Sequence, residues 1–306
     1  VSLRSAAVPM ARQRAVCRSN SSPEITQNYA VIRALGAGKY GQVKEVQHKG
    51  SKQRFAWKQV LSDKGSPESE PEVQLLRNLR HQNIIQIHEV YSAPGVVDMV
   101  LELCTDGSMK RYMRSRVEKR DGAIIYRPPR SHEIAGALFQ LLSAVSFLHH
   151  HEVAHRDIKP DNVLLSGQKW KLADFNLACH FGVRTRKVMR SKAGTRPFMA
   201  PEVLEKGRSY TEKCDIYSLG VIFIALRTGQ HYWHPESCED EQLAEEARSL
   251  LTEERWQGMG RGALPFAVEM ISPEADRCDA EEALAKPWLV QQLGRRLGEV
   301  SCCTIS

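Results

Sequence analysis

The stretch VAHRDIKPDNVLL, residues 153–165, places six polar or charged side chains within eight positions, between two apolar flanks. Charged groups in such a setting are costly to bury unless they are paired or bind something. We interpret the stretch as a short loop between two strands that carries a carboxylate, a cation and an amide. A chemical function is the first hypothesis for this loop, whose polar residues are His155, Arg156, Asp157, Lys159, Asp161 and Asn162.

The sequence around this loop divides into a strand-rich part followed by a helical part. Alternating apolar residues predict short antiparallel strands over 29–38, 41–50, 53–61, 84–92 and 96–104, with a helix near 73–79. Helical periodicity dominates from residue 108 onwards and predicts strong helices over 135–151 and 215–229. The polar segment 114–131 ends in two prolines and is predicted to be a surface loop.

The composition is typical of a globular protein, with 306 residues, of which 42% are apolar and 26% charged. No apolar run approaches the roughly 18 residues of a membrane-spanning helix, and the longest one, 217–226, predicts a buried core helix. The net charge of +7 leaves room for anionic ligands such as a nucleotide. Because the basic residues do not form one long block, we expect no nucleic-acid partner.

Eight cysteines are scattered along the chain, without a CxxC pair and without the Cys/His spacing of a zinc site. This pattern predicts free thiols in a reducing compartment. We therefore expect a cytoplasmic protein, and we expect it to be a monomer.

Both ends of the sequence differ from its middle. Residues 1–27 are predicted to be a disordered basic tail or an organelle targeting segment, because residues 1–23 are rich in arginine and serine and contain no acid. Residues 293–306 are predicted to be a C-terminal tail, which ends in the form of a prenylation signal at Cys303. Lipidation of Cys303 would add membrane association, and the alternative is a chance tail with two reduced thiols.

The segment GAGKYGQV, residues 36–43, places three glycines where two predicted strands meet, at the tip of a hairpin. Without side chains, these glycines let backbone N–H groups approach a polyphosphate closely. Lys58 follows on the third strand, where its ammonium can neutralise phosphates. Such a lysine needs a carboxylate to hold it, and Glu72 at the start of the next helix is the best candidate, with Glu68 and Glu70 as close rivals.

Six ordered segments resemble the motifs of eukaryotic protein kinases of the Ser/Thr type. The resemblance covers roughly residues 29–290 and implies a kinase domain over 28–292, with an N-lobe at 28–105 and a C-lobe at 106–292. The implied fold class is α+β, with a small antiparallel β-sheet and one key helix in the N-lobe and a larger, mainly helical C-lobe. The similarity to the calcium/calmodulin-dependent and NIMA-related groups is only loose. The segments are the glycine loop at 36–43, AWK at 56–58, HRDIKPDN at 155–162, DFN at 174–176, APE at 200–202 and DIYSLG at 215–220.

The resemblance assigns roles in phosphoryl transfer, a reaction that depends on positioning and charge neutralisation. Asp157 would accept the proton of the substrate hydroxyl, and Lys159 would steady the γ-phosphate. Lys58 would grip the α- and β-phosphates while it is paired with Glu72. Two further residues would hold Mg²⁺, and three would be structural. The metal ligands are Asn162 and Asp174, and the structural residues are Asp215, which would tie down the loop backbone, and Glu202 and Arg277, which would form a buried ion pair.

The resemblance also implies an ATP site. Leu101 would guard the adenine pocket, while Glu102 and Cys104 would offer backbone hydrogen bonds to the base. Ser108 stands where many relatives carry a ribose-binding acid, so this contact is weaker or absent. The implied ATP-binding residues are Gly36, Ala37, Gly38, Lys39, Tyr40, Gly41, Val43, Ala56, Lys58, Leu101, Glu102, Cys104 and Ser108.

The segment 174–202 corresponds to an activation loop and carries six arginine or lysine residues, which repel one another unless an anion arrives. A phosphate brings about −1.5 to −2 charge, so we expect phosphorylation at Ser191, or next at Thr185, to order this loop. Thr195 is expected to face the predicted catalytic residues. The alternative is a solvated basic loop without a regulatory phosphate.

One position departs from the family pattern, because Asn176 replaces the glycine of Asp-Phe-Gly. Asparagine tolerates left-handed conformations better than most residues, but it stiffens this hinge. Since the metal ligand Asp174 is intact, we expect activity with altered switching. A further hypothesis is that a side-chain oxygen of Asn176 lies near the metal.

Together, these residues predict a Ser/Thr protein kinase that uses ATP and Mg²⁺ to phosphorylate hydroxyls of protein substrates. The second hypothesis is a pseudokinase scaffold that binds nucleotide and partners without efficient transfer, and the complete set of polar site residues disfavours it. A third class, a small-molecule or lipid kinase, is disfavoured by GTRPFMAPE at 194–202, which resembles a peptide-binding segment.

Overall fold

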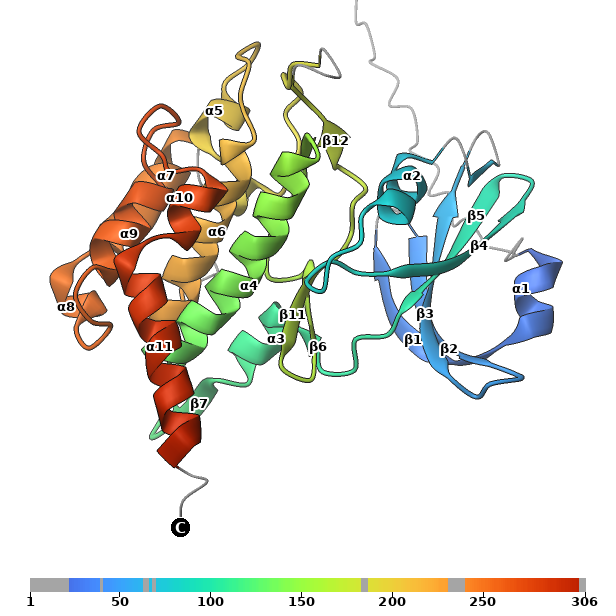
Figure 1. Ribbon diagram of the computed structural model, residues 1–306, viewed down its shortest axis with the longest axis horizontal. Coiled ribbons are helices and arrows are strands. Elements are labelled where there is room, and N and C mark those ends of the chain that lie inside the picture. The colour runs from blue at the N-terminus through green and yellow to red at the C-terminus, as the bar shows by residue number, and fades with distance from the viewer. Residues whose placement is uncertain are drawn as a thin grey trace, which may run out of the picture.

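The computed structural model has two lobes, a smaller one built on a β-sheet and a larger one built mainly of helices (Figure 1). It describes residues 22–38, 41–62, 66–67, 70–182, 187–230 and 240–302. The predicted two-lobed α+β fold is confirmed, with the strand-rich lobe first in the chain. Five residues with predicted roles lie outside the described residues, namely Lys39, Tyr40, Glu68, Thr185 and Cys303.

The N-lobe contains a five-stranded antiparallel sheet between two helices. Its elements are α1 (Pro23–Asn28), β1 (Tyr29–Gly38), β2 (Gly41–His48), β3 (Arg54–Leu61), α2 (Pro71–Asn78), β4 (Ile87–Ala93) and β5 (Val96–Glu102). The strands pair in the order β1-β2-β3-β5-β4. Successive side chains of a strand point to opposite faces, so Phe55 and Trp57 of β3 form a small core on one face, while Ala56 joins the main core, which also contains α2.

Helix α1 belongs to the N-lobe, so the predicted tail over residues 1–27 differs from the structure at residues 22–27. Ile25 is fully buried in the small core with Phe55 and Trp57. The backbone N–H of Ser22 donates to the buried carboxylate of Asp98 at 3.0 Å, and the same carboxylate accepts from the Trp57 indole at 2.8 Å. A helix of six residues is too short to show a hydrophobic period, which is why periodicity did not predict it.

The C-lobe is built around two helices, α4 and α6. Its elements are β6 (Gly107–Ser108), α3 (Met109–Arg114), β7 (Val117–Arg120), β8 (Ala123–Tyr126), α4 (Ser131–His150), β9 (Val153–Ala154), β10 (Val163–Ser166), β11 (Lys169–Leu172), β12 (Cys179–His180), α5 (Pro201–Leu204), α6 (Lys213–Thr228), α7 (Asp240–Ser249), α8 (Glu253–Trp256), α9 (Ala263–Met270), α10 (Ala280–Leu284) and α11 (Pro287–Cys302). All residues of α6 between Cys214 and Leu226 are buried. The predicted core helix at 217–226 therefore lies in the centre of this lobe.

Helix α4 is the one described helix that is long and apolar enough to cross a membrane by length and composition. Its apolar residues do not form a continuous run in the sequence, because polar residues such as Glu133 and Gln140 interrupt them. In the structure, 56% of its apolar window is buried, and it packs against α6, α10, α11 and β11. These contacts are those of a core helix.

The prediction of a surface loop over 114–131 is wrong in part, because β7 and β8 form a hairpin there. Its turn consists of Asp121 and Gly122, whose φ angles of 51° and 80° suit a two-residue hairpin turn with two left-handed residues. The Tyr126 hydroxyl donates to the backbone oxygen of Leu226 at 3.0 Å. A Cβ at Gly229 would lie 2.2 Å from the Tyr126 ring, so a glycine is needed where the hairpin packs on the end of α6.

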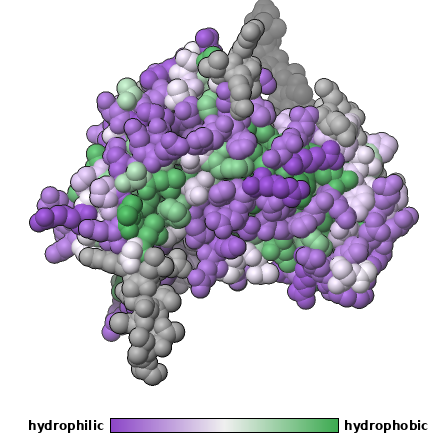
Figure 2. Space-filling view, in the orientation of Figure 1, coloured by the Kyte–Doolittle hydropathy of each residue, from purple (hydrophilic) through white to green (hydrophobic). Residues whose placement is uncertain are grey.

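The face of the molecule in Figure 2 is mostly hydrophilic, and its hydrophobic residues gather in separate patches. The exposed large hydrophobic residues of the described chain are likewise dispersed over both lobes, including Leu61 in the N-lobe and Val268 and Val290 in the C-lobe. Scattered exposed apolar residues are normal in globular proteins.

Candidate active site

Lys58 of β3 is surrounded by carboxylates from α2 and from the segment after β11. Its Nζ donates to both carboxylate oxygens of Glu72, at 2.8 and 2.7 Å, and to Oδ1 of Asp174 at 2.8 Å. Burial acts to lower the pKa of Lys58, but the two carboxylates outweigh burial and raise this pKa, so the ammonium stays charged. Two of the glutamates considered as partners of Lys58 are described by the structure. Glu72 is the partner, and Glu70 is the N-cap residue of α2.

Glu72 also fixes the DFN segment, which follows β11. Its Oε1 accepts a hydrogen bond from the backbone N–H of Phe175 at 3.1 Å. Phe175 is fully buried, and its ring lies 4.7 Å from the ring of His155 in an edge-on arrangement. The segment that carries Asp174 is thus connected both to α2 and to the HRDIKPDN loop.

Asp157 lies at the centre of a second cluster. Lys159 Nζ donates to Oδ2 of Asp157 and to Oγ1 of Thr195, both at 2.7 Å. The Thr195 hydroxyl donates to Oδ1 of Asp157 at 2.7 Å. The side-chain amide of Asn162 donates to the backbone oxygen of Asp157 at 2.9 Å and to its Oδ2 at 3.0 Å. Three neighbours therefore orient this carboxylate, and Thr195 faces the two predicted catalytic residues.

Asp215 of α6 holds the backbone that precedes Asp157. Its two carboxylate oxygens accept from the N–H groups of His155, at 2.9 Å, and Arg156, at 2.8 Å. Arg156 has a φ of 64°, a left-handed conformation that is costly for a residue with a side chain, and these bonds stabilise it. Burial acts to raise the pKa of Asp215, but the hydrogen bonds and electrostatic interactions with His149 and His155 lower this pKa.

Glu202 and Arg277 form a buried ion pair that connects α5 to the segment before α10. The two guanidinium nitrogens donate to the two carboxylate oxygens at 2.5 and 3.1 Å, and the side chains are 3% and 0% exposed. A buried pair is stable only if its remaining donors find acceptors. Arg277 meets this condition, because it also donates to the backbone oxygens of Ser272 and Lys213.

The N-lobe sheet brings together the residues predicted to bind ATP. Gly36 is opposite Val43 in the β1–β2 pair, and Val43 is opposite Lys58 in the β2–β3 pair. Ala56 is opposite Leu101 in the β3–β5 pair. The backbone of Ala37, Gly38 and Gly41 forms the end of the β1–β2 hairpin, where the glycines were expected.

The segment after β5 contains the other predicted ATP-binding residues. Glu102 Oε1 accepts from Lys171 Nζ and from the backbone N–H of Gln86, both at 2.8 Å. Ser108, for which a weak or absent ribose contact was predicted, caps α3 in the structure, where its hydroxyl accepts from the backbone N–H of Arg111 at 3.4 Å. Cys104 is half-buried, and burial raises the pKa of its thiol to about 12.

Sequence comparison decides the family to which this arrangement belongs. The family model described as "Protein kinase domain" matches residues 29–289. The chain belongs to the protein kinase family. The matched residues of this kinase domain contain both clusters described above, together with the buried ion pair of Glu202 and Arg277.

Curated relatives of this kinase domain carry the name serine/threonine-protein kinase. The chain is 28% identical over 291 residues to "Serine/threonine-protein kinase 33" of Mus musculus, 29% identical over 288 residues to "Serine/threonine-protein kinase H1 homolog" of Danio rerio, and 30% identical over 286 residues to "Ovarian-specific serine/threonine-protein kinase Lok" of Drosophila melanogaster. The alignments cover 89%, 89% and 87% of this chain but only 57%, 64% and 57% of the relatives. The chain thus spans less than two thirds of the length of these relatives.

Protein kinases in general use ATP and Mg²⁺, and the oxygen atoms of this kinase fit such a metal. Among the described residues, no group of three His, Cys, Asp or Glu side chains forms a complete metal site. However, no described residue donates a hydrogen bond to Oδ2 of Asp174 or Oδ1 of Asn162. Mg²⁺ is usually held by one or two carboxylates together with phosphate oxygens, so this partial oxygen set suits a metal that arrives with a nucleotide.

Asn176 contacts the predicted metal ligand directly. Its side-chain amide donates to Oδ1 of Asp174 at 2.5 Å, the same oxygen that accepts from Lys58. The hypothesis that an oxygen of Asn176 lies near the metal differs from this arrangement, in which the amide nitrogen faces the carboxylate. Asn176 is not among the described residues with positive φ, whereas Asp174 has a φ of 64°. The observed conformation therefore does not require glycine at position 176.

Two residues of this site were not predicted from the sequence. His149 Nε2 lies 3.0 Å from Oδ2 of Asp215, and the Tyr210 hydroxyl donates to the backbone oxygen of Ser191 at 2.7 Å. His149 follows the buried residues Leu142 and Val145 by seven and four positions, so helical periodicity could have placed it on the inner face of α4. Tyr210 has no such signal, because its partners are distant in the sequence.

The raised pKa of Cys104 predicts slow alkylation. The thiolate is the reactive form, so at pH 8 a thiol with a pKa of about 12 should react on the order of a thousandfold more slowly than one with the ordinary thiol pKa of 9.0. The rate of iodoacetamide modification, followed by mass spectrometry, should rise about tenfold per pH unit between pH 8 and 10. The same protein unfolded in urea is the control, and a folded-state rate that levels off near pH 9 would contradict the assignment.

Proposed function

We propose that this kinase domain transfers the γ-phosphate of ATP to Ser or Thr hydroxyls of protein substrates. The observation that carries the proposal is the placement of the two clusters, which hold Lys58 and Asp157. The backbone N–H of Ala173 donates to the backbone oxygen of Asn162 at 2.9 Å, so the segment with Asp174 lies beside the loop with Asp157. The names of the curated relatives support the choice of Ser and Thr.

Each side chain then has a role that its contacts support. Asp157, oriented by three neighbours, accepts the proton of the substrate hydroxyl at a carboxylate oxygen. Lys58, kept charged by Glu72, offsets the charge of the α- and β-phosphates, and Lys159 offsets that of the transferred group. Asn162 Oδ1 and Asp174 Oδ2 would hold Mg²⁺, which neutralises phosphate charge when bound.

Phosphorylation of Ser191 is proposed to control this activity. Arg156 Nη1 donates to the Ser191 hydroxyl at 2.8 Å, and Arg156 Nε donates to the backbone oxygen of Leu177, also at 2.8 Å. A phosphate on Ser191 would meet the guanidinium in charge-assisted hydrogen bonds. Because Arg156 directly precedes Asp157, these bonds would couple the state of the loop to the position of the catalytic carboxylate.

Ser191→Ala is expected to lower the activity of the otherwise phosphorylated protein by about 10- to 100-fold. One hydrogen bond to a charged group contributes about 1.5–3 kcal/mol, and the variant loses both the phosphate and its bonds to Arg156. Mass spectrometry of the active wild-type protein should find phosphate on Ser191, and Thr185→Ala serves as the comparison variant. Active protein without phosphate at 185 or 191 would remove the proposal for regulation.

A pseudokinase scaffold is the second candidate, and the contact between Asn176 and Asp174 favours it, because the amide occupies an oxygen of the predicted metal ligand. If the protein is an active kinase, Asn176→Gly should mainly change the time that the protein needs to reach full activity. The final turnover number should change less and should stay within about tenfold of wild type. Turnover of variant and wild type is measured after prolonged preincubation with ATP. If the glycine variant gains several orders of magnitude, the native protein is a weak or inactive kinase.

The proposed function is tested by a transfer assay with ATP, Mg²⁺ and a degenerate library of Ser- and Thr-containing peptides. Transfer by the wild-type protein and none by Asp157→Asn supports the proposal. Nucleotide binding without transfer to any peptide or protein would favour the scaffold. Failure to bind nucleotide with Mg²⁺ present would reject both functions.

A further inference from the structure

Lys171 of β11 is a buried lysine that has no role in the proposed transfer reaction. It is 7% exposed, and a lysine is rarely buried to this degree unless its ammonium is paired. Its partner is Glu102, the last residue of β5, whose Oε1 accepts from Lys171 Nζ at 2.8 Å. The two side chains are 9% and 22% exposed. The pair therefore joins the N-lobe sheet to a strand of the C-lobe, across 69 residues of sequence.

The Glu102 side of this ion pair is also bonded to the segment before β4. Oε1 of Glu102 accepts from the backbone N–H of Gln86 at 2.8 Å, and the backbone N–H of Glu102 donates to the backbone oxygen of Gln86 at 2.9 Å. The side-chain amide of Gln86 donates in turn to the backbone oxygens of His81 and Ile84, both at 3.3 Å. One carboxylate oxygen thus serves both an ammonium and a backbone N–H.

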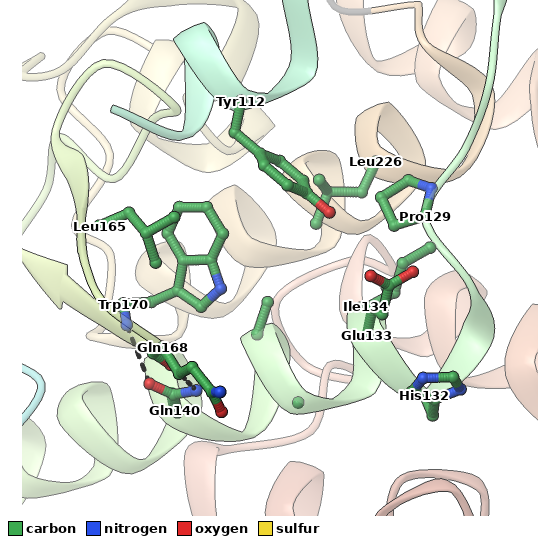
Figure 3. A pocket seen from close by; sticks show the side chains of 12 residues that line it. Tyr112, Pro129, His132, Glu133, Ile134, Gln140, Leu165, Gln168, Trp170 and Leu226 are labelled. Carbon is green, nitrogen blue, oxygen red and sulfur yellow. Dashed lines mark hydrogen bonds between the residues drawn. The ribbon is translucent and has the colours of Figure 1, made fainter. Parts of the chain in front are cut away.

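The Lys171 side of the ion pair lies on a strand whose neighbouring residues are fixed. The backbone N–H of Trp170 donates to Oε1 of Gln140 at 2.9 Å, beside a cavity of about 420 Å³ between α3, α4, the β10–β11 hairpin and the end of α6 (Figure 3). The side-chain amide of Asn83 donates to the same oxygen at 3.0 Å and to the backbone oxygen of Trp170 at 2.7 Å. The backbone N–H of Leu172 donates to the backbone oxygen of Asn83 at 2.8 Å. The residues on both sides of Lys171 therefore have defined positions.

The ion pair connects the two ends of the nucleotide site. The backbone of Glu102 and Cys104 is predicted to bind the adenine base, and Asp174 is predicted to hold the metal at the phosphates. Lys171 bonds to the side chain of Glu102 and lies three residues before Asp174 in the chain. A ligand that contacts both ends binds more tightly when the distance between them is set before it arrives, because less order has to be created on binding.

We propose that Lys171 is a positioning residue for nucleotide binding. Through its ion pair it holds Glu102, and with it the base-binding backbone, at a fixed place relative to Asp174. It thereby favours a nucleoside diphosphate or triphosphate that arrives with Mg²⁺ over a nucleoside without phosphates. The inference rests on the nucleotide site of the proposed function, but it requires no phosphoryl transfer.

The test compares the binding of two ligands to the full chain by isothermal titration calorimetry. Adenosine contacts only the base end of the site, whereas ADP with Mg²⁺ contacts both ends. Lys171→Met should weaken the binding of ADP with Mg²⁺ about tenfold, and the affinity for adenosine should change less than about threefold. Lys171→Arg keeps a cation and should bind ADP with Mg²⁺ within about threefold of wild type. In a transfer assay, Lys171→Met should raise KM for ATP more than it lowers kcat.

Lys169→Met is the matched control for Lys171→Met. Lys169 lies on the same strand, two residues earlier, but its side chain is exposed, so the same substitution there should leave both affinities unchanged. Glu102→Gln removes the charge from the other partner and keeps an oxygen for the N–H of Gln86. This variant should show the same pattern as Lys171→Met, and it covers the case in which Lys171→Met fails to fold, as judged by circular dichroism.

The outcomes separate this inference from the proposed function. Binding of ADP with Mg²⁺ that stays within about twofold of wild type in the folded variants, or an equal loss for both ligands, would overturn the positioning role. If the wild-type protein also transfers phosphate, such a result rejects this inference alone. The expected binding pattern without any transfer would reject the proposed function alone. A wild-type protein that binds neither ligand would reject both.

Discussion

Asp157→Asn is expected to lower kcat for phosphoryl transfer by about a hundredfold to ten thousandfold, the usual contribution of a positioned general base. The amide has nearly the shape of the carboxylate, but it cannot accept the proton of a substrate hydroxyl. ATP affinity should stay within about threefold of wild type, because Asp157 bonds to Lys159, Asn162 and Thr195 and not to Lys58. Single-turnover transfer and fluorescent nucleotide binding measure the two effects separately.

Asp161→Asn is the matched control for this variant. Asp161 lies in the same loop and is half exposed, with its carboxylate 2.8 Å from Lys110 Nζ. The same chemical change there removes an exposed ion pair, which contributes little, so transfer should remain near the wild-type rate. The role of Asp157 as base is rejected if Asp157→Asn keeps a rate within threefold of wild type, or if Asp161→Asn loses as much.

Arg277→Met is expected to lower the free energy of unfolding by about 3–5 kcal/mol, the usual cost of removing one partner from a buried ion pair. The variant leaves the Glu202 carboxylate, which is 3% exposed, without its two guanidinium donors. It also leaves the backbone oxygens of Ser272 and Lys213 without the bonds from Arg277. Urea denaturation followed by circular dichroism measures the loss.

Arg208→Met provides the comparison on the surface. Arg208 pairs with Glu205 at 2.7 Å, but both side chains are about half exposed, so its removal should change stability much less than Arg277→Met. Adding Glu202→Leu to Arg277→Met should recover part of the loss, because no unpaired charge then stays buried. Equal losses for Arg208→Met and Arg277→Met would contradict a special role of the buried pair.

Local patterns in the sequence predicted the lobes and selected the candidate site residues. The alternation around Ala56 predicted β3, and the long apolar run at 217–226 predicted the centre of α6. The structural elements that were not predicted also have local explanations. Helix α1 is too short to show a period, and the Asp121–Gly122 turn signal was overlooked inside a polar segment.

The residues available for chemistry could be predicted from the sequence, because the motifs are short and ordered along the chain. Which of these residues meet in space depends on how distant segments pack. Lys58 and Asp174 are 116 residues apart, and Glu202 and Arg277 are 75 residues apart, yet each pair is in direct contact. The cavity beside Trp170 depends likewise on four elements that no local pattern connects. The physical reason is that periodicity and motifs record neighbours along the chain, whereas ion pairs, burial and cavities arise from packing between distant segments.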